Sequence, residues 1–161
     1  MGMTTLLRFD VAKTLQTDET VMQNWLTLIE ANYHSTNSYH NSSHAADVLQ
    51  ATAVFLERPA LCYSLDLLDI VVCLVGAIIH DVDHPGRNSA FLCNSGSELA
   101  ILYNDTTVLE NHHSALGFRL TQSDNRVNIF ANVEPDTYKQ LRSGLIDVVS
   151  VKRFLFISIS N

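Results

Sequence analysis

The segment from Asp66 to Asp81 constrains the fold more than any other part of this sequence. Its apolar residues are almost uninterrupted and would cover most of the surface of a helix. A length of about fifteen residues is long for a β-strand, and the apolar run 70–79 is roughly half of what a membrane-spanning helix needs. The segment therefore predicts a helix that is buried on most sides within a globular domain.

The rest of the sequence up to residue 149 also favours helices. Apolar residues recur at helical spacing in the segments 18–29, 43–56, 98–103, 106–120 and 135–149. Thr17 or Asp18 is a suitable N-terminal cap for the first of these segments. No alternating strand pattern precedes residue 150, and no repeat or linker interrupts the chain. We expect an all-α fold, with residues 2–149 forming one multi-helical unit.

Composition and charge narrow the possible partners and the cellular location. Hydrophobic residues make up 47% of the 161 residues, which is enough for a core. The formal net charge of −7 is opposite to that of a nucleic-acid-binding surface, so no nucleic-acid polymer is expected as a partner. The short apolar run argues against a membrane as a partner. The cysteines Cys62, Cys73 and Cys93 are odd in number and lack CxxC spacing. They predict small buried side chains in a reducing compartment, and hence a cytoplasmic location.

Two short segments concentrate histidine and aspartate. His40 and His44 are four residues apart, and so are His80 and His84, so each pair would share a face of a helix. Asp81 directly follows His80, which places a hard oxygen donor beside a nitrogen donor. This mixture suits a divalent cation such as zinc, and a carboxylate can also bridge to a harder cation such as magnesium or manganese.

The position of His80 and Asp81 makes a metal site the preferred interpretation. A single pair of histidines at this spacing is common on exposed helices, but these two residues end a nearly continuous apolar run, where ionisable groups are costly unless they are paired or bound to metal. Glu110, His112 and His113 add a carboxylate and two imidazoles on one helical turn. His34, by contrast, is interpreted as a surface or loop histidine.

The reaction class follows from which motifs the sequence contains. It has no glycine-rich phosphate loop, no GxSxG segment and no HExxH segment. Metal-assisted hydrolysis is the reaction that the grouped residues support.

The sequence resembles the class I 3′,5′-cyclic-nucleotide phosphodiesterases, a family of helical metal hydrolases of the His-Asp type. The motifs that carry the resemblance are Tyr39-His40-Asn41-Ser42-Ser43-His44-Ala45-Ala46-Asp47-Val48 and His80-Asp81-Val82-Asp83-His84-Pro85-Gly86. The stretches 91–104 and 109–113 continue it, and it covers residues 2–149. Within the family the sequence is most similar to the high-affinity, cyclic-AMP-specific eighth subfamily.

The resemblance implies a role for individual residues and two divalent cations as cofactors. His44, His80 and Asp81 match ligands of a Zn²⁺ ion, and Asp81 also bridges to a Mg²⁺ or Mn²⁺ ion. His40 matches the general acid that protonates the ribose 3′ oxygen when cyclic AMP is hydrolysed to 5′-AMP. A neighbouring carboxylate favours the charged form of a histidine, which fits the matched role of Glu110 in orienting His40. The remaining matches are His84, beside the attacking water, and Tyr39, in the substrate pocket.

The sequence departs from the family pattern in two places. The asparagine that usually follows the second motif is replaced by Ser89, with Asn88 one residue earlier. The family's catalytic domain is also roughly twice as long. Its second half supplies another aspartate to the zinc, and a glutamine and an aromatic clamp for the purine. We therefore expect residues 2–149 to be the N-terminal part of a truncated catalytic domain, with apolar helix faces left exposed. Residues 150–161 form a divergent tail of high β-propensity.

Three functional interpretations remain open at the level of sequence. The first is a cyclic-nucleotide phosphodiesterase active in signal transduction. The second is an inactive fragment that binds metal weakly or associates with a full-length phosphodiesterase as a regulatory partner. The third is a different His-Asp metal phosphohydrolase, against which the dedicated acid His40 and its partner Glu110 argue. The sequence does not predict an oligomeric state.

Overall fold

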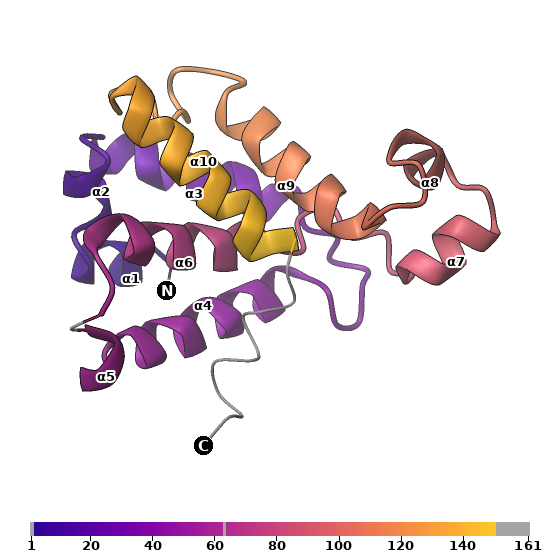
Figure 1. The fold of residues 1–161 in the computed structure, drawn as a ribbon, viewed down its shortest axis with the longest axis horizontal. Coiled ribbons are helices and arrows are strands. Elements are labelled where there is room, and N and C mark those ends of the chain that lie inside the picture. The colour runs from indigo at the N-terminus through magenta and orange to yellow at the C-terminus, as the bar shows by residue number, and fades with distance from the viewer. Residues whose placement is uncertain (1, 63, 151–161) are drawn as a thin grey trace.

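The computed structural model describes residues 2–62 and 64–150, and every regular element within them is an α-helix (Figure 1). The helices are α1 (Gly2–Arg8), α2 (Val11–Thr14), α3 (Glu19–Ala31), α4 (Ser42–Leu56), α5 (Pro59–Cys62), α6 (Leu67–Ile79), α7 (Ser89–Asn94), α8 (Glu98–Leu102), α9 (Val108–Thr121) and α10 (Pro135–Ser150). The prediction of an all-α fold is confirmed. The short helices α1, α2, α5 and α7 were not anticipated from the sequence.

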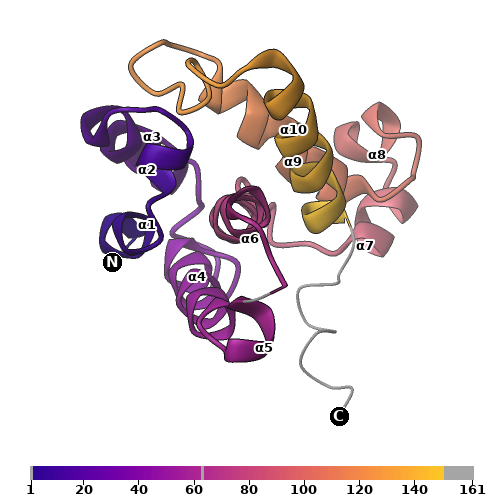
Figure 2. The same ribbon diagram turned by 60° about the vertical axis from the view of Figure 1, so that its left-hand side comes forward.

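Helix α6 is the centre of the fold. Every residue from Val71 to Ile79 except Cys73 is buried. Helices α4, α9 and α10 pack against α6, and Figure 2 shows α6 nearly end-on with the other long helices around it. The apolar run therefore forms the buried helix that its composition predicts. No helix in the described part of the chain is long and apolar enough to cross a membrane.

The two ends of α6 are fixed by different interactions. At its start, the Asp66 side chain accepts a hydrogen bond from the Asp69 backbone N–H (2.8 Å), and the Asp69 side chain accepts one from the Asp66 N–H (3.2 Å). This reciprocal cap satisfies backbone donors that no helical carbonyl can reach. At its other end His80 is the C-terminal cap, so Asp81 lies in the turn that follows the helix.

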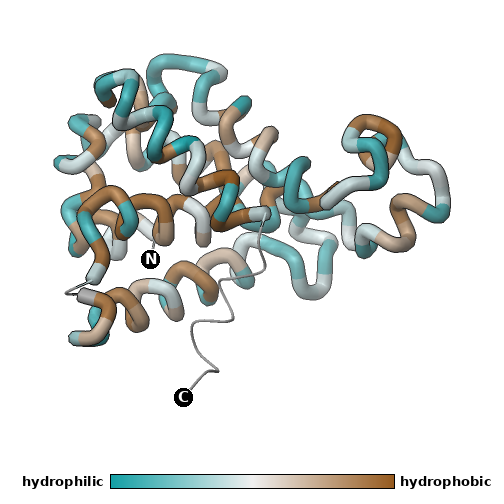
Figure 3. The backbone as a smooth tube through the Cα atoms, in the orientation of Figure 1, coloured by the Kyte–Doolittle hydropathy of each residue, from teal (hydrophilic) through white to brown (hydrophobic). Residues whose placement is uncertain are grey.

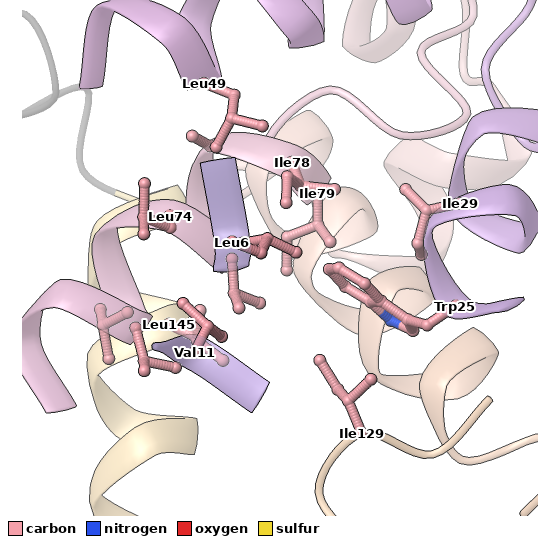
Figure 4. Close-up of a cluster of buried hydrophobic side chains, with 14 of the residues drawn as sticks. Leu6, Val11, Trp25, Ile29, Leu49, Leu74, Ile78, Ile79, Ile129 and Leu145 are labelled. Carbon is pink, nitrogen blue, oxygen red and sulfur yellow. The ribbon is translucent and has the colours of Figure 1, made fainter. Parts of the chain in front are cut away.

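Helix α3 is joined to α9 through a buried polar contact within the apolar core. The indole N–H of Trp25 donates to Thr121 Oγ1 (2.8 Å), and Trp25 has no exposed surface. Figure 4 shows Trp25 beside Ile29 and Ile129, with Leu6, Ile78 and Ile79 on the other side of its ring. The N-terminal helices are thus part of the same core as α6. Asp18 precedes α3 at the N-cap position, but its side chain makes no capping hydrogen bond.

Two glycines let α9 and α10 approach α6 closely. A Cβ atom on Gly117 would lie 3.0 Å from Ile79 Cδ1, and one on Gly144 would lie 3.0 Å from Val72 Cγ2. These distances are shorter than ordinary van der Waals contact. The absence of a side chain at Gly117 therefore brings α9 against the end of α6 that carries His80 and Asp81.

Helices α7 and α8 form a small lobe that projects from the rest of the described chain (Figures 1 and 3). Leu92 and Ala100 of the lobe form a small apolar cluster with Val108 and Leu109 at the start of α9. The same two short helices leave large apolar side chains exposed: Phe91, Ile101 and Leu102. The lobe therefore has both a small core and an apolar surface.

The expectation of buried cysteines needs correction, and the expectation of a divergent tail concerns residues outside the described structure. Cys73 and Cys93 are free and only partly buried, Cys73 in the middle of α6 and Cys93 in the projecting lobe. The prediction of fully buried cysteines is therefore wrong for these two. The predicted divergent tail lies outside the described residues from 151 onward.

Candidate metal centre

The histidine pairs lie across helix ends and do not share a helical face. His40 precedes Asn41, whose side-chain oxygen caps α4 by accepting from the N–H groups of Ser43 (3.0 Å) and His44 (3.2 Å). In the second pair, His80 ends α6 and His84 lies beyond a turn in the chain. The prediction that each pair lies on one helix is wrong, because a cap separates the members of the first pair and a helix end separates the members of the second.

Three donor atoms from α4 and from the end of α6 converge on one point. His44 Nε2 lies 3.2 Å from His80 Nε2 and 3.3 Å from Asp81 Oδ2, and the last two atoms are 3.2 Å apart. Tetrahedral zinc with bonds of about 2.0–2.1 Å requires its ligand atoms to be about 3.3 Å apart. The residues present therefore fit a divalent cation, and their nitrogen and oxygen donors are of the type that zinc prefers.

The backbone of α6 determines which nitrogen of His80 faces this point. His80 Nδ1 lies 2.9 Å from the carbonyl oxygen of Ala77, which can only accept, so Nδ1 carries a hydrogen. Nε2 is then the nitrogen available to a proton or a metal ion. A hydrogen bond on the far nitrogen of a metal-binding histidine is the usual way of fixing its orientation.

The three groups shift one another's pKa values. Burial and the neighbouring His80 lower the pKa of His44. Burial opposes charge on His80 and Asp81 as well, but their hydrogen bond and mutual attraction raise the pKa of His80 and lower that of Asp81. The shifts of His80 and Asp81 show that their contact favours an ion pair, and a divalent cation would supply the positive charge beside Asp81 in its place.

His113 extends the centre on the side of α9. It is 2% exposed, and its Nδ1 donates to the carbonyl oxygen of Val82 (2.7 Å), which leaves Nε2 facing Asp81 Oδ1 at 3.8 Å. Burial lowers the pKa of His113 to about 4, so its ring is neutral at pH 7. Asp81, His84 and His113 form a second group of donors that could hold a metal ion.

The predicted proton donor, His40, lies beside the candidate metal ligands. The ring of His40 stacks on that of His84, with centroids 3.9 Å apart and planes 6° from parallel. Tyr39 is 61% exposed, and its ring centroid lies 4.9 Å from that of His40 and 4.4 Å from that of His44. Burial, followed by the charge of His40, lowers the pKa of His84. The chain therefore brings together all of the predicted site residues from its first two motifs.

Glu110 lies on the first turn of α9. Its Oε2 is buried and has no hydrogen-bond partner in the described part of the chain, and no hydrogen bond joins it to His40 there. The predicted orienting role of Glu110 stays a prediction. A buried carboxylate oxygen without a donor is costly, so this atom is available to a further group.

Sequence reasoning missed a third group of residues beside the metal centre. The two carboxylate oxygens of Asp83 lie 2.6 Å from His34 Nε2 and 2.8 Å from His112 Nε2. His34 is exposed, as predicted for a surface residue, but it is not isolated. The available signal was a second acidic residue within the His80–His84 segment.

The comparisons with known proteins agree with this geometry. The sequence pattern described as 3′5′-cyclic nucleotide phosphodiesterase matches residues 39–151, which contain every candidate site residue. The chain belongs to the 3′5′-cyclic nucleotide phosphodiesterase family. Membership of this family implies divalent metal ions, and the cluster of His44, His80 and Asp81 offers donors for one.

Relatives within the phosphodiesterase family are similar over nearly the whole chain. The human high affinity cAMP-specific and IBMX-insensitive 3′,5′-cyclic phosphodiesterase 8A is 55% identical over 92% of this chain. The corresponding phosphodiesterase 8 of Drosophila melanogaster is 52% identical over 92%, and the rat 3′,5′-cyclic-AMP phosphodiesterase 4C is 45% identical over 87%. The chain spans 18%, 16% and 26% of the lengths of these relatives.

Solved structures of phosphodiesterases share the fold. The phosphodiesterase domain of the RhoPDE fusion protein from the choanoflagellate Salpingoeca rosetta matches 92% of this chain with a TM-score of 0.86 and 34% identity. The match covers 46% of that solved chain. The helices described above therefore correspond to part of a phosphodiesterase domain.

Proposed function

We propose that this chain provides the metal site and the proton donor for hydrolysis of cyclic AMP to 5′-AMP. The convergence of His44 Nε2, His80 Nε2 and Asp81 Oδ2 within 3.2–3.3 Å of one another carries the proposal. The names of the most similar relatives support cyclic AMP as the substrate. We further propose that residues 2–149 are the N-terminal part of a catalytic domain that acts in cytoplasmic signal transduction.

The proposed ligands are His44, His80 and Asp81 for Zn²⁺, with Asp81 shared by a Mg²⁺ or Mn²⁺ ion. A bound divalent cation makes water a nucleophile near neutral pH and offsets the negative charge of the phosphate. This local positive charge is needed in a chain with a net charge of −7.

The residues of the chain then perform the proton transfer. Water adds to phosphorus and releases one proton to solvent, while the bond from phosphorus to the ribose 3′ oxygen breaks. An N–H of the His40 imidazolium gives its proton to that oxygen, and His40 then regains a proton from solvent. The stacked ring of His84 and the contact with Tyr39 restrict where His40 can point. In the same proposal Glu110, on α9, orients His40, and Tyr39 borders the substrate.

An assay of the purified chain tests the proposal. The chain is loaded with Zn²⁺ and Mg²⁺, incubated with cyclic AMP or cyclic GMP, and examined for 5′-nucleotide by chromatography. We expect 5′-AMP to form, and a chelator or His80→Ala to abolish its formation. Metal binding without turnover would favour the alternative of an inactive fragment that associates with a full-length phosphodiesterase, an alternative supported by the 46% coverage of the matched solved domain.

The substitution His40→Asn separates proton donation from metal binding. Asparagine cannot act as a general acid, so we expect turnover to fall by about 10²–10⁴-fold. Metal content, measured by atomic emission on the same sample, should remain that of the parent chain. Unchanged turnover would remove His40 from the proposed role.

A further inference from the structure

Asp83 joins the turn after α6 to two other parts of the chain. Its backbone N–H donates to the carbonyl oxygen of Asn32 (2.9 Å), at the end of α3. Its carboxylate accepts from His34, in the loop after α3, and from His112 on α9. A carboxylate has no hydrogen to donate, so both histidines present an N–H to it. The side chain of His112 is only 10% exposed, which makes this the better shielded of the two contacts.

The backbone of Asp83 is also unusual. Its φ of 59° lies in the left-handed region, which aspartate tolerates better than most residues but which still costs free energy. The backbone hydrogen bond to the end of α3 and the carboxylate hydrogen bonds to His34 and His112 hold Asp83 in this conformation. The turn carries Asp81 two residues before Asp83 and His84 directly after it, so the conformation of Asp83 determines how these two side chains are presented.

We propose that Asp83, together with His34 and His112, positions Asp81 and His84 for metal binding. This inference rests on the proposed metal centre, but Asp83, His34 and His112 are not among the proposed metal ligands. Both carboxylate oxygens are used, one toward each histidine, so neither asparagine nor alanine reproduces the contacts. Outer hydrogen-bond partners of this kind typically change metal affinity by about 10–100-fold when they are removed.

Cobalt binding to the full chain provides the test. Co²⁺ is titrated into the parent chain and into Asp83→Ala, Asp83→Asn and His112→Ala, and its affinity and visible absorption spectrum are recorded. Asp10→Ala is the matched control, because Asp10 is an exposed residue with a φ of 53° and no side-chain capping hydrogen bond. Asp10→Ala also places alanine at a left-handed φ, as Asp83→Ala does, but at a position outside the metal centre. Thermal unfolding is followed by circular dichroism for every variant.

The inference predicts a loss of Co²⁺ affinity of about 10–100-fold and an altered spectrum for Asp83→Ala. Asp83→Asn, which keeps one acceptor oxygen, should lose less affinity, and Asp10→Ala should match the parent chain. A variant of Asp83 that unfolds at lower temperature yet binds Co²⁺ with parental affinity and spectrum would show a merely structural role and overturn the inference.

A parent chain that binds no Co²⁺ would instead contradict the proposed metal centre. The positioning role is then decided on the metal-free chain by NMR of the histidine rings. Asp83→Ala should shift the imidazole resonances of His84, which stacks on His40, whereas Asp10→Ala should leave them in place. Unshifted His84 resonances in Asp83→Ala would overturn the inference on this route.

Discussion

At the scale of single residues, burial affects the side chains of the metal centre in opposite ways. Burial lowers the pKa of His113 to about 4, and it outweighs the hydrogen bond to the Val82 carbonyl and the attraction of Asp81 at 3.8 Å. His80 is also enclosed, but its hydrogen bond to Asp81 raises its pKa. The pKa values of the two histidines therefore shift in opposite directions, because only His80 has a carboxylate oxygen within hydrogen-bonding distance.

His113 should make the metal-free chain sensitive to acid. Its pKa is about 4 in the folded chain and about 6.5 when unfolded, so the unfolded state binds more protons between these values. The stability that the neutral ring preserves is complete above pH 6.5 and is lost as the pH falls toward 4. The change is roughly 3 kcal/mol at most.

His113→Asn isolates this contribution, because asparagine retains an N–H for the Val82 carbonyl but cannot gain a charge in this range. Urea unfolding at pH 7, 6 and 5 measures the free energy of unfolding of both chains without metal. From pH 7 to pH 5 the free energy of unfolding should fall more in the parent than in the variant. Both chains contain His80, so its contribution cancels when the two are compared. Parallel pH profiles would show that His113 titrates normally.

At the scale of helices, the centre depends on how closely α9 approaches α6. Gly117 faces Ile79, the last residue of α6, and His113 lies one turn earlier on α9. The separation of the two helices thus sets the distance from His113 to Asp81. The close contact at Gly117 and the hydrogen bond from His113 to the Val82 carbonyl both hold α9 against this end of α6.

Gly117→Leu should force the two helices apart. A leucine side chain cannot fit where a single Cβ already comes within 3.0 Å of Ile79, so we expect a loss of about 1–3 kcal/mol in the free energy of unfolding. Ala115→Leu, on the exposed side of the same helix, is the control and should change stability by about 0.5 kcal/mol or less. Chemical unfolding followed by Trp25 fluorescence measures both. Equal stabilities would contradict the close packing of α9 on α6.

At the scale of the whole molecule, the described chain has a well-buried centre and an incompletely covered edge. Helix α6 is enclosed by α4, α9 and α10, whereas the lobe of α7 and α8 exposes Ile101 (70%) and Leu102 (64%). Large exposed apolar side chains that lie next to each other favour association. The match to 46% of a solved phosphodiesterase domain is consistent with such an edge.

The lobe should therefore drive self-association of the isolated chain. Replacing both exposed residues, in Ile101→Lys with Leu102→Gln, should weaken association by about tenfold or more, because each buried aliphatic side chain contributes about 1.5–3 kcal/mol. Sedimentation velocity across a range of concentrations measures this. Gln140→Lys, on the exposed side of α10, adds the same charge elsewhere and should not change association. A parent chain that stays monomeric, or a control with the same effect, would contradict the prediction.

The local patterns were sufficient to predict most of the long helices and the first-motif residues of the site. The apolar run of α6 allowed few alternatives, since only a buried helix satisfies both its backbone and its side chains. The prediction that His40 and His44 share a helical face was wrong, because Asn41 is the N-cap of α4 and the helix begins at Ser42, after His40. Helix ends depend on such single side chains, which spacing alone does not reveal.

The sequence by itself determined the helical class, the buried position of α6, the family resemblance and the identity of His44, His80 and Asp81 as candidate ligands. Only the tertiary structure decided that His113 faces Asp81, that His40 stacks on His84, and that Asp83 joins His34 to His112. The physical reason is the separation along the chain over which each kind of interaction acts. Hydrophobic periodicity and capping act within a few residues of chain, whereas these contacts join residues 29 to 49 positions apart and depend on the packing of α9, and of the loop after α3, beside the end of α6.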